Sequence, residues 1–123
     1  MSHITLIETN VKFMNENILR QALQALGEVG NGIVDHYNTR QKMDMSVYTM
    51  GVPKGIGFKK QGNGEYKVMM DDYGYVTQAH NLLNQISQKY QELAITKAVQ
   101  HQGYHAQAQA QEDGTVKILA RRY

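Results

Sequence analysis

The chain has 123 residues with one Pro, no Cys, no Trp and a formal net charge of +2. This length suits a single domain over residues 1–123, because a second independent hydrophobic core would not fit. The lack of Cys excludes disulfides, thiolate zinc sites, iron–sulfur ligation and cysteine nucleophiles. The small net charge does not by itself predict a nucleic-acid or membrane partner. No apolar run approaches the roughly 20 residues that cross a bilayer, and no basic leader opens the chain, so we expect a cytoplasmic protein.

The first third of the chain predicts a strand followed by a helix. β-branched residues predict a strand over residues 3–9. Asn15 is a candidate N-cap for the helix, and Gly27 would end it. The apolar residues between them recur at helical spacing: Ile18, Leu19, Ala22, Leu23 and Leu26.

The middle of the chain predicts two strands and a loop. A turn is predicted at Gly30-Asn31-Gly32, because glycine and asparagine favour turns. Residues 33–38 and 45–50 are the predicted strands. Residues 51–57 hold the only proline and three glycines, which predicts an exposed loop.

The next hairpin has two possible registers, which differ in how they sort its side chains. A two-residue turn at Asn63-Gly64 would mix polar and apolar residues on both faces. A three-residue loop over residues 62–64 instead places Phe58 beside Val68 on one face and Lys59 opposite Lys67 on the other. This second register also puts Gly64 where a bulge needs positive φ, so we predict it.

The C-terminal part predicts a long helix and a last hairpin. The helix runs from about Thr77 to Gln102, and its apolar stripe comprises Ala79, Leu82, Leu83, Ile86, Tyr90, Leu93, Ala94 and Ala98. A three-residue loop over residues 112–114 aligns Ala106, Ala108 and Ala110 with apolar partners, which predicts an inward alanine face. Together the elements predict an α+β fold: one antiparallel sheet of hairpins with two helices packed on one face, a ferredoxin-like variant by analogy.

Short motifs along the chain are similar to those of one known family. They are residues 1–5, Ile56-Gly57-Phe58, Tyr66-Lys67-Val68, Asp71-Asp72-Tyr73-Gly74, residues 112–116 and Arg121-Arg122-Tyr123. In them the chain resembles the family of chloroplast hypothetical reading frame 35, which occurs in plastids, cyanobacteria, other bacteria and phages. It departs from the family at Asp72-Tyr73 and Tyr123, where tryptophan is common. The resemblance implies a single-domain intracellular protein and supplies no activity, cofactor or catalytic residue.

Four lysines around the middle hairpin form a candidate site for an anion or an acidic partner. They are Lys54, Lys59, Lys60 and Lys67. Opposed like charges on a sheet are mildly destabilising, and a phosphate or a partner's carboxylates would neutralise them. Alternatively, the lysines extend into solvent and keep an edge strand from pairing with other chains.

Residues 54–59 partly match the RNP1 pattern, in which aromatic side chains of a sheet stack on RNA bases. The match fails at Ile56, Lys59 and Gln61, and the register places Phe58 in the core. RNA binding is therefore the weaker interpretation.

Catalytic patterns are sparse. Asp71 and Asp72 together with His80 are the only candidates for acid–base or metal chemistry, and adjacent strand residues point to opposite faces. No HExxH, GxSxG, Walker or dinucleotide motif occurs. We therefore expect a protein that is not an enzyme and has no cofactor and no metal.

Tyrosines and methionines in the middle of the chain are candidates for a protein interface, although both residue types also fill cores. The candidates are Tyr37, Tyr48, Tyr73, Tyr75 and Met45. Numerous amides, 13 Gln and 8 Asn by count, are interpreted as a solvated surface.

The sequence favours a small non-enzymatic module that docks on a larger intracellular protein assembly. The alternative is a weak RNA- or single-strand-binding protein that uses the basic hairpin. A hydrolase or metal enzyme around Asp71, Asp72 and His80 is the third hypothesis.

Overall fold

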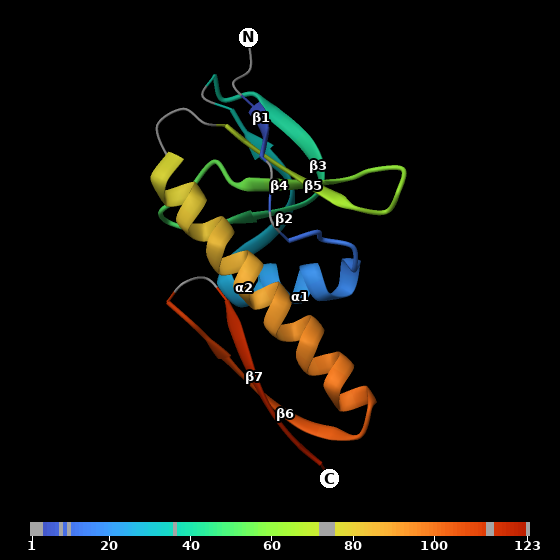
Figure 1. Ribbon diagram of the computed structural model, residues 1–123. Coiled ribbons are helices and arrows are strands. Elements are labelled where there is room, and N and C mark those ends of the chain that lie inside the picture. The colour runs from blue at the N-terminus through green and yellow to red at the C-terminus, as the bar shows by residue number, and fades with distance from the viewer. Residues whose placement is uncertain are drawn as a thin grey trace.

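The protein has an α+β fold, as the sequence predicts (Figure 1). The computed structural model describes residues 4–7, 9, 11–35, 37–71, 76–112 and 115–122. The elements in chain order are β1 (Ile4–Ile7), α1 (Glu16–Leu26), β2 (Glu28–Val34), β3 (Arg40–Tyr48), β4 (Ile56–Lys60), β5 (Tyr66–Asp71), α2 (Val76–His101), β6 (Tyr104–Ala110) and β7 (Val116–Arg122).

The strands form two antiparallel sheets. Five strands pair in the order β1-β5-β4-β3-β2, and β6 pairs only with β7 among the described strands. The expectation of one sheet is therefore wrong for the last hairpin. That hairpin packs on α2 and extends away from the five-stranded sheet (Figure 1). Side chains of α1 and α2 share one core with β3, β4 and β5, so both helices cover the same face of the larger sheet.

Both helices agree with their predicted spans. The Ile18 N–H donates to the Asn15 side-chain oxygen at 3.0 Å, which is the expected N-cap, and α1 ends before Gly27. Helix α2 covers residues 76–101, within one residue of its predicted ends. Four of the residues predicted for the first strand, Ile4–Ile7, form β1.

The two middle strands differ from the prediction. The expected turn at residues 30–32 lies inside β2, and the chain turns instead at residues 35–39. A register shift between Gly30 and Gly32 accommodates these glycines in the strand. The ring of Tyr48 lies over Gly30, where a Cβ would come within 3.0 Å of it. Gly30 therefore allows the Tyr48 ring to pack closely on β2. The turn between β2 and β3 is instead held by hydrogen bonds to the Asp35 side chain.

Both predicted hairpin registers are confirmed. Phe58 pairs with Val68, Lys59 pairs with Lys67, and Gly64 has φ +88°. In the last hairpin Ala110 pairs with Val116, which is the register of a three-residue loop. The predicted inward alanine face falls on side chains that are outside those the structure describes.

Phe13 lies at the centre of the core. Its ring packs edge-on against Phe58 of β4 at 5.5 Å and against Tyr90 of α2 at 5.0 Å between ring centroids. Its carbonyl accepts a hydrogen bond from the Tyr66 N–H of β5 at 2.8 Å. The Tyr90 hydroxyl accepts from the N–H groups of Met14 (3.1 Å) and Asn15 (3.0 Å). This one residue and its neighbours therefore connect both helices to the sheet.

The β2–β3 hairpin curls over the sheet face that the helices leave uncovered. The Val34 N–H donates to the Lys54 carbonyl at 2.9 Å, which links the end of β2 to the loop before β4. Buried Ile33 and Met43 lie over Gly57 of β4, where a Cβ would meet the Met43 Cγ at 2.5 Å. Because Gly57 has no side chain, Ile33 and Met43 can pack directly on the backbone of β4.

We expect Tyr90→Phe to lower the free energy of unfolding by about 1–3 kcal/mol, because the N–H groups of Met14 and Asn15 lose their acceptor. Urea unfolding measures the change. Thr96→Val is the matched control, since within the described part of the chain the Thr96 hydroxyl is buried without a partner. Removing it should leave stability unchanged or higher. A Tyr90→Phe protein as stable as the parent would contradict the assigned role.

We expect Gly57→Ala to cost about 1–3 kcal/mol, because the new methyl group overlaps Met43 and crowds Ile33. Thermal and urea unfolding measure the cost. Gly62→Ala, with no atom within 4 Å of its new Cβ, is the control and should be nearly neutral. In a Met43→Ala background the cost of Gly57→Ala should shrink. An equal cost in both backgrounds would show that the curled hairpin does not press on Gly57.

Candidate functional site

The sheet face opposite the helices carries an apolar pair and a lysine pair. Leu6 of β1 lies directly opposite Met69 of β5, and Lys67 of β5 lies opposite Lys59 of β4. These side chains point away from α1 and α2, because neighbouring residues such as Ile7 and Val68 contact the core. Leu6 is 46% exposed and Met69 is half-buried. We call the surface of Leu6, Met69, Lys67 and Lys59 the open face.

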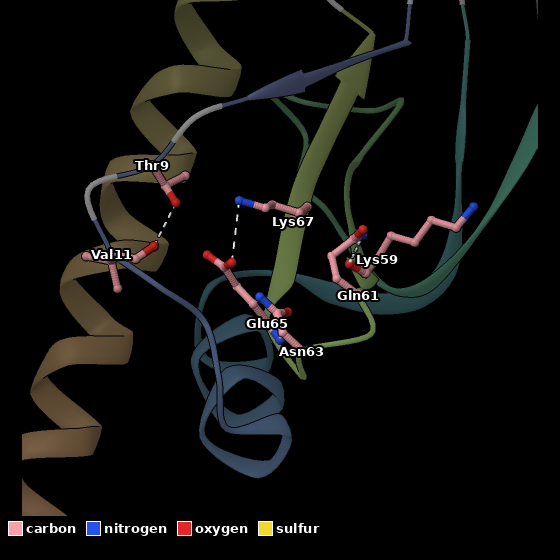
Figure 2. Close-up of polar contacts among 7 residues, drawn as sticks. All are labelled: Thr9, Val11, Lys59, Gln61, Asn63, Glu65 and Lys67. Atoms are coloured by element: carbon pink, nitrogen blue, oxygen red, sulfur yellow. Dashed lines mark hydrogen bonds and ion pairs between the residues drawn. The ribbon is translucent and has the colours of Figure 1, made fainter.

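The two opposed lysines do not converge on a common point. Their ammonium groups point away from each other in Figure 2, although their backbones are paired. The Lys67 ammonium lies 3.4 Å from the Glu65 carboxylate, in an ion pair that is partly exposed. Lys59 lines a crevice of about 210 Å³ with Lys42, Met43 and Asp44. The structure thus separates the two charges and gives each an acidic neighbour.

The other two lysines of the predicted site lie at opposite ends of β4. Lys60 is exposed at its end, and the Lys60 N–H donates to the Asp44 carboxylate at 2.7 Å. Lys54 precedes the strand, is half-buried, and its carbonyl accepts from Val34. Four lysines close in sequence therefore do not form one anion pocket.

The hairpin tip between β4 and β5 is held by its own polar side chains. The Asn63 side-chain oxygen accepts from the Glu65 N–H at 3.0 Å, and the Gln61 amide donates to the Lys59 carbonyl at 3.0 Å (Figure 2). Beside the Lys67–Glu65 pair, the Thr9 hydroxyl donates to the Val11 carbonyl at 2.6 Å. The Asn63 and Gln61 bonds fix the loop that sets the lysine register, and the Thr9 bond lies in the neighbouring segment between β1 and α1.

The predicted tyrosine and methionine surface is only partly present. Met45 is 1% exposed in the core, so its prediction as an interface residue is wrong. Tyr48 is half-buried, and its hydroxyl donates to the Gly32 carbonyl. Tyr37 is 57% exposed in the β2–β3 turn. Tyr73 and Tyr75 lie outside the described residues.

The RNP1-like segment does not present an aromatic ring to solvent. Phe58 is fully buried against Phe13, as its predicted register requires. Base-stacking proteins need exposed rings on the sheet surface. Among the described open-face residues, Leu6, Met69 and the two lysines provide none.

The end of the sheet holds two buried carboxylates. Asp35 is 2% exposed and Asp71 is 6% exposed. The Asp35 side chain accepts hydrogen bonds from the N–H groups of Tyr37 and Thr39, both at 2.9 Å. Burial and the Asp71 charge raise the pKa of Asp35, but these two bonds and one from Gln41 outweigh them and hold it below its ordinary value of 3.8. Asp35 therefore acts as an ionised cap of the β2–β3 turn.

The third hypothesis required Asp71, Asp72 and His80 to converge. Asp72 lies outside the described residues, and His80 is exposed on α2. Within the described ranges, no three His, Asp or Glu side chains are grouped as metal ligands would be. No helix in that part of the chain is long and apolar enough to span a bilayer.

The sequence interpretation named neither Leu6 nor Met69 as a site residue, although the predicted register already put Met69 on the same face as Lys59 and Lys67. Ile4 and Leu6 alternate with Thr5 and Ile7, which was a weak signal for a strand with two apolar faces. The pairing of β1 with β5 decides that Leu6 joins Met69 on the uncovered face, and that pairing is not local.

The low pKa of Asp35 predicts an acid-sensitive contribution to stability. Because its folded-state pKa lies below 3.8, the contribution is complete above that pH and is lost as the pH falls through the lowered value. Asp35→Asn keeps an acceptor oxygen but cannot ionise, so its stability deficit relative to the parent should shrink on acidification below about pH 4. Urea unfolding over a pH series measures this. Glu112→Gln, exposed in the last hairpin, controls for charge loss; a deficit that persists at low pH contradicts the role of Asp35.

One comparison with known proteins gives a match. The model of a family described as protein of unknown function (DUF1257) matches residues 22–119. No curated protein and no solved structure matches the chain. The matched span runs from within α1 to within β7 and includes four of the five strands of the larger sheet in full, β2, β3, β4 and β5. The chain therefore belongs to the DUF1257 family of proteins of unknown function.

Proposed function

We propose that the protein is a small, non-enzymatic interaction module that docks on a larger intracellular protein assembly through its open face. The observation that carries the proposal is the Leu6–Met69 pair, which both helices leave uncovered and which lysines flank. An exposed apolar group bordered by charge is typical of a protein-binding surface. The proposal assigns no catalytic residue and places the protein in the cytoplasm.

The charges on the open face indicate the partner's chemistry. The Lys67 side chain is 33% exposed in its ion pair with the largely buried Glu65, so its ammonium, which has three donors, can also bind a partner's carboxylate while it stays paired with Glu65. Lys59 extends away from Lys67 and can reach a second carboxylate (Figure 2). We therefore expect a partner surface with an apolar centre and an acidic rim.

The proposal extends to the wider group of relatives. The resemblance of the chain's motifs to those of the chloroplast reading frame 35 family supports a common docking role for this chain and the proteins of that family in plastids, cyanobacteria, other bacteria and phages. The partner would then be an assembly common to these hosts.

Weak binding of RNA or single-stranded nucleic acid is the second candidate. Lys42, Lys59, Lys60 and Lys67 on or beside the same hairpins favour it, because a basic surface attracts phosphates. The burial of Phe58 disfavours it, since the open face then lacks a ring for base stacking.

An affinity-capture experiment with matched variants tests both candidates. The tagged protein is incubated with a native lysate, with and without nuclease, and the eluate is quantified by mass spectrometry and ultraviolet absorbance. We expect a nuclease-resistant protein partner at fixed stoichiometry, whose recovery falls at least about tenfold with Leu6→Asp. Ile95→Asp is the control, because Ile95 on α2 is 38% exposed and lies away from the open face.

A second variant separates docking from folding. Lys59→Gln with Lys67→Gln leaves the apolar pair intact and should reduce partner recovery less than Leu6→Asp does, with the larger effect at low salt. Equal recovery by parent and Leu6→Asp would refute docking through the open face. Nucleic acid in the eluate that is lost on raising salt, and lost in the lysine variant, would establish the second candidate instead.

A further inference from the structure

A second surface lies on the other side of the molecule, between α2 and the loop that joins β3 to β4. It is a groove of about 390 Å³, and the loop runs beside the N-terminal half of α2 (Figure 1). Its lining residues come from α1, the loop and α2: Leu26, Thr49, Gly51, Val52, Gln78, Asn81, Leu82 and Gln85. None of these side chains is charged, which distinguishes the groove from the open face.

Three amide side chains of α2 form one wall of the groove. Gln78, Asn81 and Gln85 follow at i, i+3 and i+7, which places them on one face of the helix. All three are exposed, and none has a hydrogen-bond partner within the described part of the chain. Buried Leu82 and Val52 provide an apolar floor beneath them.

The same helix already uses an amide to hold extended backbone. The side-chain amide of Gln88, three residues after Gln85, donates to the carbonyl of Gln111 at 2.9 Å. Gln111 directly follows β6, so this bond fixes the end of a strand against α2. Gln78, Asn81 and Gln85 continue this series of amides toward the N-terminus of the helix, beyond the reach of the last hairpin.

An extended polypeptide matches this arrangement in chemistry and in spacing. Each carboxamide both donates and accepts, as each peptide group of a backbone requires. Gln85 lies seven positions after Gln78 in the helix, a rise of about 10 Å, which corresponds to about three residues of an extended chain. Because the lining is uncharged, a charged side chain of a ligand would lose hydration without gaining an ion pair.

We propose that this groove binds an extended, uncharged segment of a partner polypeptide, with Gln78, Asn81 and Gln85 hydrogen-bonded to its backbone. The apolar floor of Leu82 and Val52 receives small or aliphatic side chains of the segment. This inference rests on the proposed function, protein binding, and adds a second contact with a different chemistry.

Selection from a random peptide library tests the groove directly. Phage that display peptides of about 12 residues are panned on the full-length protein, and enriched peptides are synthesised with a fluorophore for anisotropy titration. We expect the enriched peptides to be uncharged. Their Kd for the double variant Asn81→Ala with Gln85→Ala should be at least about tenfold higher than for the parent protein, because two backbone-binding amides are lost. The Kd should change less than about twofold between about 50 and 500 mM NaCl.

Two controls make the result specific. Gln100→Ala removes an exposed amide near the C-terminal end of α2 and should leave the Kd unchanged, as should Leu6→Asp on the open face. The groove proposal would be overturned if no peptide is enriched, or if the enriched peptides bind the double variant as tightly as the parent protein. Acidic peptides that salt displaces, and that no longer bind the Lys59→Gln, Lys67→Gln variant, would also overturn it and would locate binding at the open face. Capture through the open face can succeed or fail independently of these outcomes.

Discussion

The position of Phe13 is the constraint on which the rest of the fold depends. Its ring lies between Phe58 of β4 and Tyr90 of α2, and its carbonyl pairs with Tyr66 of β5. The Tyr90 hydroxyl accepts hydrogen bonds from the N–H groups of Met14 and Asn15, which lie just before α1 and have no partner within that helix. Both helices are thereby fixed to one face of the five-stranded sheet. The opposite face is left without a helix, and this asymmetry creates the open face.

How much of that opposite face remains exposed depends on the curl of the β2–β3 hairpin. Ile33 and Met43 lie over Gly57 and close the part of the sheet next to β3, whereas Leu6 and Met69 at the β1 side stay outside this cover. Glycine at position 57 allows the curl, because any side chain there would displace Met43. A packing requirement therefore determines the size and the place of the candidate binding surface.

The two proposed surfaces differ in the interactions they offer a partner. The open face combines apolar side chains with lysines, so its association should respond to salt. The groove beside α2 offers uncharged amides over an apolar floor, and its binding depends on shape and on backbone hydrogen bonds. Helix α2 separates them, since its buried stripe faces the core while Gln78, Asn81 and Gln85 remain exposed. One partner that contacts both surfaces would bind more tightly than through either alone.

The sequence alone determined what local periodicity controls: the α+β class, both helices with the Asn15 cap, and the hairpin registers that pair Phe58 with Val68 and Lys59 with Lys67. Tertiary structure decided which residues face solvent, and there the predictions for Met45 and the turn at residues 30–32 were wrong. Alternation shows that two residues share a face of a strand, but not whether a distant helix covers that face. The burial of Met45, the exposure of Leu6 and the separation of the lysine ammonium groups all depend on contacts between elements far apart in the chain, which no local pattern encodes.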